Sequence, residues 1–379
     1  MVATDVAGKA GSDLRHVMLN GRRRLIGAFC GVGLIGAVAL FSVVREQAAF
    51  YRVTTLPPYR GYLFWPIAMN DQGQIVGYWF DGTKFTVLLW SRQSGLRDLG
   101  ITSDSTLAIN NSGQIAGTMT DPNGNTMVFL WDPRTGLAHF DCRNMSNIMP
   151  ILIGPEGQIV GTFDGRSRHA YVWDHAGRMT DLNPLNAQMS WVCRSNESGQ
   201  ILGAFFDGNS SRSCLWNLAD ANSPEWVPLP GQDDAYCDLN NGGHVLRAMF
   251  RPSESPNQRP QKWAMLWHED RGRTWLFPLP DLDADVEYVN DANQVVHYRK
   301  SRSIFTKWFP RLFPARWHSF LWDPVHGSIS LDKALGLRGS EQLFIEDVND
   351  EGCIVGTIWS GHVPKRSVLL EPIAGKWRR

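Results

Sequence analysis

The sequence has no arrangement of cysteine and histidine typical of a metal site. Its six cysteines form no C-x-x-C pair, which excludes the common zinc-binding and thioredoxin-like motifs. Cys30 lies in an apolar N-terminal segment, so the body of the chain holds an odd number of cysteines. These are Cys142, Cys193, Cys214, Cys237 and Cys353. At least one is therefore unpaired unless it bonds to another chain, and cysteine content does not fix the redox compartment.

The chain also lacks a net charge and the motifs of several enzyme classes. It carries 37 Lys and Arg against 37 Asp and Glu, so no global charge favours nucleic acid as a partner. No G-x-S-x-G nucleophile motif occurs. The G-x-G-x-x-G match at 31–36 lies in the apolar segment, without the preceding strand that a dinucleotide site requires. No helix-period segment of useful length follows residue 50, which favours an all-β body.

The N-terminus carries a segment typical of membrane targeting. Residues 25–44 form a run without charged side chains, long enough to cross a bilayer as a helix. Arg22, Arg23 and Arg24 precede it directly, so the positive-inside rule leaves residues 1–24 in the cytoplasm. The sequence thus predicts one N-terminal transmembrane helix, a short tether at 45–50 and an exported body. The alternative is secretion after cleavage of a signal peptide, and both interpretations export the body.

A phrase of the form Asn-x-x-Gly-Gln-Ile-Val-Gly, followed by a strand that ends in Trp, repeats along the body. Its copies begin at Asn70, Asn110, Gly154 (in place of Asn), Asn196, Asn240, Asn290 and Asn349. The Trp positions are Trp90, Trp131, Trp173, Trp216, Trp267 and Trp322. The intervals between copies run from 40 to 59 residues, and periods of this length indicate propellers or solenoids.

Each repeat contains four short strands separated by turns. The Asn-x-x-Gly turn suits the positive φ that Asn and Gly tolerate, and Asn293 takes the place of Gly in the sixth copy. Four antiparallel strands make a propeller blade, so residues 51–379 are predicted to form a seven-bladed β-propeller. The seventh copy has room for three strands only. Because an open edge strand invites aggregation, we expect Arg52–Leu56, within the unassigned segment 51–57, to close that blade as its outer strand.

The repeat resembles a bacterial extracellular repeat family named HAF after its His-Ala-Phe tripeptide. The closest copies of the tripeptide are His169-Ala170-Tyr171 and His318-Ser319-Phe320. The resemblance spans 63–372 and is strongest in units one to four. It implies an exported repeat protein and carries over no catalytic residue. Together with the N-terminal segment, it implies a single-pass protein of a bacterial inner membrane, with the propeller in the periplasm or outside the cell.

Unit six departs from the repeat by a long insertion between its second and third strands, which is both basic and aromatic. The candidate binding residues are Arg299, Lys300, Arg302, Lys307, Trp308, Arg311, Arg316 and Trp317. This composition, beside the insertion of unit five at 250–263, suits an anionic ligand, a lipid surface or a protein partner. The alternative is a solvated insertion whose aromatic rings pack on the blade.

A second departure is acidic. Asp281, Asp283, Asp285 and Glu287 alternate at the entry to the first strand of unit six, so period two places them on one face. Asp233, Asp234 and Asp238 hold similar places in unit five, and Glu346 and Asp347 in unit seven. The first strand of a blade is innermost, so these acids are expected near one side of the channel mouth.

Three uses of these acids remain open. They can pair with the adjacent basic loops, or Asp283, Asp285 and Glu287 can bind Ca²⁺. They can also supply the carboxylates of a hydrolase or lyase acting on carbohydrate. The leading expectation is a membrane-anchored, exported propeller that binds a ligand or partner without catalysis and without a required cofactor. An exported propeller enzyme is the alternative, and no nucleic-acid partner is expected.

Overall fold

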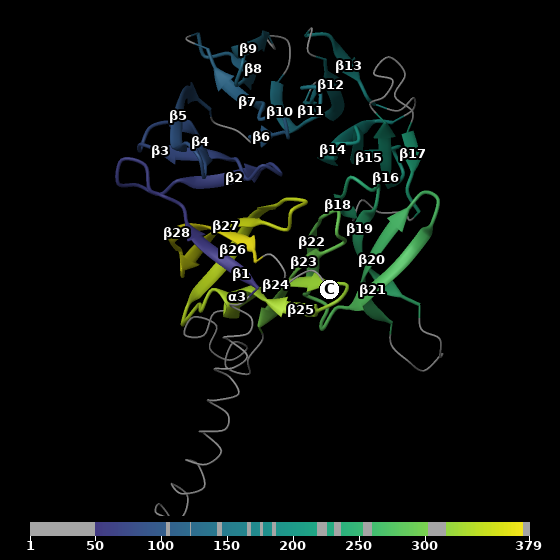
Figure 1. The fold of residues 1–379 in the computed structure, drawn as a ribbon. Coiled ribbons are helices and arrows are strands. Elements are labelled where there is room, and N and C mark those ends of the chain that lie inside the picture. The colour runs from purple at the N-terminus through teal and green to yellow at the C-terminus, as the bar shows by residue number, and fades with distance from the viewer. Residues whose placement is uncertain are drawn as a thin grey trace, which may run out of the picture.

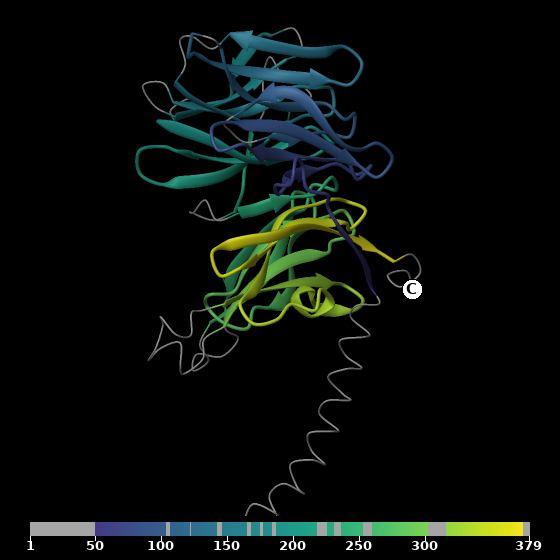
Figure 2. The same cartoon turned by 90° about the vertical axis from the view of Figure 1, so that its left-hand side faces the viewer.

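Seven four-stranded antiparallel sheets stand as blades around a central axis (Figure 1). The computed structural model describes residues 50–103, 107–121, 123–141, 146–164, 168–174, 177–183, 187–217, 226–230, 236–252, 260–301 and 316–373. The predicted all-β, seven-bladed propeller is confirmed, and Figure 2 shows the disc from another side. The predicted transmembrane segment 25–44 lies outside the described residues. Within the ranges given above, no helix is long and apolar enough to span a membrane.

The strands of each blade are called A to D from the innermost outward. Blade 1 contains β2 (Trp65–Met69), β3 (Ile75–Phe80), β4 (Phe85–Ser91) and β5 (Gly95–Thr102). Blade 2 contains β6 (Ala108–Ile109), β7 (Ile115–Thr120), β8 (Thr126–Asp132) and β9 (Gly136–Asp141). Blade 3 contains β10 (Ser146–Ile153), β11 (Ile159–Asp164), β12 (Arg168–Trp173) and β13 (Met179–Asp181). Blade 4 contains β14 (Met189–Ser195), β15 (Gln200–Phe206), β16 (Ser211–Asn217) and β17 (Trp226–Pro228).

The remaining blades follow the same plan. Blade 5 contains β18 (Tyr236–Leu239), β19 (Val245–Arg251), β20 (Gln261–His268) and β21 (Gly272–Pro278). Blade 6 contains β22 (Asp285–Val289), β23 (Val295–Ser301), β24 (Arg316–Asp323) and β25 (Gly327–Ser330), and the short helix α3 (Leu331–Ala334) follows it. Blade 7 contains β26 (Glu341–Val348), β27 (Ile354–Ser360), β28 (Val363–Pro372) and β1 (Tyr51–Thr55).

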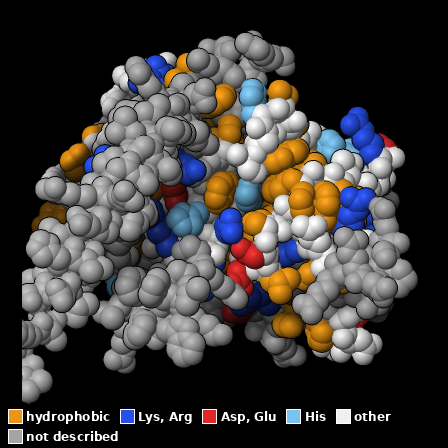
Figure 3. All heavy atoms as spheres, turned by 90° about the horizontal axis from the view of Figure 1, so that it is seen from below, with side chains coloured by type: hydrophobic (Ala, Val, Ile, Leu, Met, Phe, Trp, Pro, Cys, Tyr) orange, Lys and Arg blue, Asp and Glu red, His pale blue; other side chains and the backbone are white. Residues whose placement is uncertain are grey.

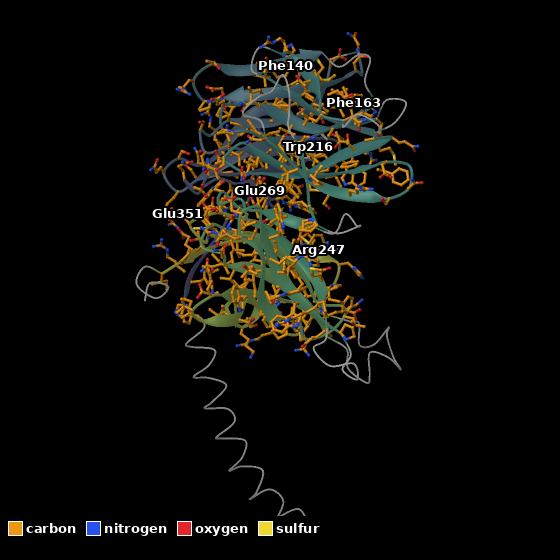
Figure 4. The ribbon with its side chains drawn as sticks, turned by 90° about the vertical axis from the view of Figure 1, so that its right-hand side faces the viewer. Phe140, Phe163, Trp216, Arg247, Glu269 and Glu351 are labelled. Carbon is orange, nitrogen blue, oxygen red and sulfur yellow. The ribbon has the colours of Figure 1, made fainter. Side chains whose placement is uncertain are left out.

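The two faces of the disc differ in the connections they carry. The A–B and C–D turns lie on one face, here called the turn face, and the B–C and D–A connections lie on the opposite, loop face. In Figure 4, Glu351 of the last A–B turn lies at one side of the disc, and Phe163, near the B–C end of β11, lies toward the other. The core fills the spaces between blades, where strand side chains of adjacent sheets meet, as Val172 and Val192 do.

The Asn of the repeated phrase links neighbouring blades. Its Oδ1 accepts the backbone N–H four residues ahead, as at Gln74 (2.9 Å). Its Nδ2 donates across to the backbone oxygen of the next blade's turn, as from Asn70 to Asn110 O (3.0 Å) and from Asn349 to Asn70 O (3.0 Å). The positive φ of the turn falls on the Gly instead, and on Asn293 (φ 56°) in blade 6. The sequence prediction was right for Asn293, but the Asn itself serves side-chain bonding.

The second Gly of the phrase faces a bulge in strand A. The β2–β3 register shifts between Pro66 and Ala68, opposite Gly77. A Cβ on Gly77 would lie 1.9 Å from the backbone oxygen of Trp65, so a side chain does not fit there without movement of β2. Blades 5 and 6 keep the bulge but place Arg247 and His297 at this position, both buried.

The ring closes by pairing the first strand of the body with the last. β1 runs antiparallel to β28, with Tyr51 opposite Pro372 and Thr55 opposite Val368. This is the outer position that the sequence predicts for Arg52–Leu56. Glu371 of β28 secures the closure, because it accepts from Arg52 (3.2 Å), from Thr54 (3.3 Å) and from Arg92 of blade 1.

Candidate functional site

A cavity of about 380 Å³ opens on the turn face at the end of the central channel. All seven A strands and several A–B turns contribute to its wall. The residue two places before each turn Asn lines it. In blade order these residues are Ala68, Ala108, Leu152, Arg194, Asp238, Tyr288 and Asp347. One side of the cavity is therefore apolar, from blades 1 to 3, and the other is polar and charged, from blades 4 to 7.

Arg194 organises the charged side. Its Nε lies 3.3 Å from Asp238 Oδ1, and its Nη1 donates to Cys193 O (3.1 Å). Its guanidinium carbon lies 5.5 Å from the ring centre of Tyr288, within the range of a cation–π contact. Tyr288 in turn donates its hydroxyl to Glu346 O (2.7 Å). These contacts join blades 4, 5, 6 and 7 across the channel.

The carboxyl groups of this side resist ionisation. Burial raises the pKa of Asp238 to about 6, although Arg194 opposes the shift. Burial, with repulsion from Glu287 and Asp347, raises the pKa of Glu346 to about 7. Burial raises the pKa of Asp347 to about 7 as well, even though its Oδ2 accepts from Met69 N (2.7 Å). In the described part of the chain, the Glu346 carboxylate has no hydrogen-bond or ion-pair partner, so it is the group most available to a ligand.

A second polar layer surrounds the opening. Asp350 N donates to Asp71 Oδ1 (2.9 Å), and Asp291 N donates to Asp350 Oδ1 (2.9 Å). Burial and the repulsion of these two neighbours raise the pKa of Asp350 to about 7. Asp71, Asp291 and Asp350 each follow the turn Asn of their blade. Blade 3 has Pro155 at this position. Blade 4 has Glu197, which accepts a hydrogen bond from Asn111 N (3.3 Å). The rim of the cavity is thus acidic on most of its circumference.

The acids of unit six are divided between different surroundings. β22 begins at Asp285 and bulges between Val286 and Tyr288. The predicted single face is therefore wrong for Asp281 and Asp283, which precede the strand. Asp285 Oδ1 lies 3.4 Å from Lys262 Nζ, and Asp281 Oδ2 lies 3.3 Å from Arg299 Nε. Pairing with basic neighbours, the first of the three predicted uses, is therefore present.

The calcium site proposed at Asp283, Asp285 and Glu287 stays a prediction. Burial raises the pKa of Glu287, and a hydrogen bond from Tyr298 opposes that shift. Over the residues that the structure describes, no group of three or more His, Cys, Asp or Glu side chains is placed to hold a metal ion.

The basic and aromatic candidates of the unit-six insertion are visible in part. Arg302, Lys307, Trp308 and Arg311 lie outside the described residues. Lys300 Nζ on β23 lies 5.3 Å from the Trp317 ring on β24, and Arg316 donates to Gly339 O (2.8 Å). Figure 3 shows Lys and Arg side chains beside Asp and Glu on the edge of the disc that lies below in Figure 1.

Only part of the cavity lining could be predicted from the sequence. Of the acids expected near one side of the channel mouth, Asp238, Glu346 and Asp347 line the cavity. The unit-six acids Asp281, Asp283, Asp285 and Glu287 are not part of its wall, and Asp233 and Asp234 lie outside the described residues. Arg194 and Tyr288, which join the charged side of the cavity, are not among the predicted residues. The signal for Arg194 is present in the sequence, because a charged residue replaces the Ala or Leu that the first three copies hold two places before the turn.

Comparison with solved structures supports the propeller fold. The β-propeller domain of the trilobed protease from Pyrococcus furiosus, described as having an open velcro topology, is 10% identical with a TM-score of 0.52, over 82% of this chain and 95% of that one. A post-proline cleaving enzyme from Rickettsia typhi is 9% identical with a TM-score of 0.50, over 90% of this chain and 56% of that one. An acylaminoacyl peptidase from Pyrococcus horikoshii is 10% identical with a TM-score of 0.50, over 80% of this chain and 52% of that one.

These similarities define the class of protein and no more. This chain spans 56% and 52% of the lengths of the two peptidases, and at such low identities the likeness concerns the fold alone. No protein-family model matches the chain, and no curated protein matches it. By its fold, the chain is a seven-bladed β-propeller closed by its own first strand.

Proposed function

We propose that this chain is an exported, non-catalytic binding propeller that holds a small organic cation with an apolar body in its central cavity. The observation that carries the proposal is the two-sided lining of that cavity. Ala68, Ala108 and Leu152 offer an apolar wall, and Glu346 with Asp347 offers carboxylates on the opposite side. A cavity with an apolar lining and a few convergent polar groups is the usual form of a small-molecule site.

The cavity leads to a prediction about ligand charge. Binding of 2-phenylethylamine should be measurable by isothermal titration calorimetry, whereas 2-phenylethanol, which has the same apolar body without the charge, should bind at least about tenfold more weakly, a difference of about 1.4 kcal/mol. Glu346 and Asp347 have pKa values of about 7 and must ionise to pair with the amine. Affinity should therefore rise from pH 5.5 to pH 8. Binding should release protons, so the measured heat of binding should change with the ionisation enthalpy of the buffer.

The variant Glu346→Gln distinguishes cation binding from the alternative, catalysis. Glu346→Gln should weaken amine binding about tenfold and reduce proton release, because an amide cannot ionise. Equal binding of amine and alcohol would contradict the proposal. Turnover of a carbohydrate that Glu346→Gln abolishes would favour the alternative, a hydrolase or lyase, for which a carboxyl pKa of about 7 provides a suitable general acid.

Export and anchoring form the second part of the proposal. They are supported by the apolar run 25–44 and the arginines before it. Protease added to intact cells should leave the propeller whole, and protease added after removal of the outer membrane should digest it while residues 1–24 remain protected. Digestion only after lysis of the inner membrane would contradict export.

The insertions of blades 5 and 6 are proposed as an additional contact surface for a protein or an anionic ligand.

A further inference from the structure

The loop face carries exposed aromatic side chains where blades 7 and 1 meet, at the end of the channel opposite the cavity. The exposed fractions are 63% for Tyr62, 40% for Trp65, 45% for Phe80, 39% for Phe85 and 44% for Phe344. They are not scattered singly. Phe80 stacks on Phe85 at 4.6 Å, and further rings join Trp65 to Phe344 through Trp359 (5.7 and 6.0 Å). Grouped exposed aromatic rings of this kind mark interaction surfaces.

A tight turn in the D–A connection presents a cation at this surface. Tyr59 and Tyr62 exchange two backbone hydrogen bonds (2.9 and 3.0 Å), so Arg60 and Gly61 are the two central residues of the turn. Their φ angles are 51° and 84°, as a type I′ turn requires at both positions. Gly, Asn or Asp normally fills such a place, and an arginine there is strained. Strain held at an exposed charged residue points to a functional use.

The guanidinium of Arg60 rests on an aromatic floor. Its carbon lies 5.2 Å from the ring centres of both Tyr59 and Trp79. Tyr59 is itself fixed, because its hydroxyl donates to Asp98 (2.8 Å) and its ring meets Trp79 edge-on at 5.1 Å. Among the described residues, no carboxylate pairs with Arg60. The group Tyr59, Arg60, Tyr62 and Trp79, here called the Arg60 platform, therefore holds a preorganised cation that faces solvent.

The surroundings of the Arg60 platform are basic. Lys84 is exposed in the turn between Phe80 and Phe85, and Lys365 and Arg366 are exposed just after the B–C turn of blade 7. The nearby Asp81 is occupied by its own turn, because its Oδ1 accepts from Thr83 N (2.8 Å) and Lys84 N (2.9 Å). Exposed cations and exposed aromatic rings thus occur together on the loop face of blades 7 and 1, so a suitable partner offers both negative groups and apolar faces.

We propose that the Arg60 platform and its basic surroundings bind an acidic polysaccharide. The apolar faces of sugar rings would lie on the aromatic rings, and carboxylate or sulfate groups would pair with Arg60 and Lys84. A membrane surface fits less well. β1 begins at Tyr51, opposite the end of β28, on the turn face, so the described chain enters the propeller on the face opposite the Arg60 platform.

The test uses the full chain in detergent, with polygalacturonate and dextran sulfate as polyanions and neutral dextran as control. In affinity electrophoresis, both polyanions should slow the migration of the wild-type protein. This retardation should weaken as the salt concentration rises. Arg60→Gly should weaken this binding at least about tenfold without lowering the melting temperature, because Gly adopts positive φ without strain. This variant separates loss of binding from loss of folding.

Matched variants and vesicles complete the experiment. Arg134→Ala removes another exposed arginine, whose side chain is 81% accessible, from a C–D turn on the opposite face, and it should bind as the wild type does. Glu346→Gln should also bind normally, so failure of the cavity proposal leaves this one standing. Absence of polyanion binding, equal binding by Arg60→Gly, or equal binding to neutral dextran would overturn the inference. So would Arg60-dependent binding to phosphatidylglycerol vesicles alone, which would assign the surface to a membrane.

Discussion

Replacing Arg194 by Met should destabilise the propeller by about 3 kcal/mol or more at pH 8, because removing one partner of a buried ion pair leaves the other charge uncompensated. Asp238 is 7% exposed and its ion-pair partner in the described residues is Arg194, at 3.3 Å. Methionine keeps much of the apolar bulk of the arginine stem, so the loss should reflect charge more than volume. Urea unfolding followed by tryptophan fluorescence measures it.

The loss should depend on pH in a defined direction. The pKa of Asp238 in the fold, about 6, is raised above its ordinary value of 3.8. A buried acid of this kind takes up a proton as pH falls through about 6. The protonated form stabilises the fold, and this stability is lost as pH rises through that value. Without Arg194 the folded pKa rises further. The penalty should therefore be large at pH 8 and small at pH 5.

A double variant tests the cause. Asp238→Asn added to Arg194→Met should recover much of the stability at pH 8, because the amide is neutral and its oxygen can still accept from Val289 N, as Asp238 Oδ2 does (2.6 Å). A loss that is equal at both pH values, or that Asp238→Asn does not relieve, would show that packing of the arginine stem is what matters.

Changing Gly77 to Ala should cost about 3 kcal/mol, at the upper end of what overpacking a well-filled interior usually causes. The added Cβ would lie 1.9 Å from Trp65 O and 2.8 Å from Pro66 Cα. Both are backbone atoms, so β2 itself must move, and with it the channel wall. The same conflict recurs at Gly356, where a Cβ would meet Phe344 O at 2.3 Å.

Gly242→Ala provides the matched control for this change. Gly242 is exposed, has no positive φ, and a Cβ there would meet only side-chain atoms, the nearest at 3.2 Å. The free energy of unfolding of the Gly242→Ala variant should differ from that of the wild type by less than about 0.5 kcal/mol. Chemical denaturation of both variants compares them directly, and similar stabilities would remove the packing explanation for the second Gly of the repeat.

The repeat was sufficient to predict the architecture, because blade geometry is a local property of each copy. A turn at Asn70, a short strand after it and a Trp at the end of strand C recur whatever the neighbours are. Even the closure by Arg52–Leu56 could be predicted, since the seventh copy lacks a fourth strand and an edge needs a partner.

The chemistry of the cavity could not be predicted in the same way. Arg194 meets Asp238 and Tyr288 because three different blades bring their A strands to one channel, and such pairing depends on ring geometry. Bulges add a further obstacle. The one between Val286 and Tyr288 interrupts the alternation of β22, so period two no longer tells which side chains share a face.

The departures of blades 5 and 6 also have a meaning that composition did not reveal. Arg247 and His297 replace the second Gly, and each is packed against aromatic rings instead of forming part of a surface. Arg247 lies 4.9 Å from the Tyr236 ring, and His297 lies 5.0 Å from both Phe277 and Phe320. Burial lowers the pKa of His297 to about 4, so it is neutral at physiological pH.

The pairing of β1 with β28 sets the order in which the molecule can assemble. Thr54 and Glu371, which meet in the finished ring, are 317 residues apart in sequence. Among the described strands a ribosome makes β1 first and β28 last, so β1 must wait for the other blades before its partner exists. Contacts between such distant segments slow folding. During that time, the outer edge of β28 and the bare strand β1 are open to other chains, so the propeller is most exposed to misassembly before β1 and β28 have paired.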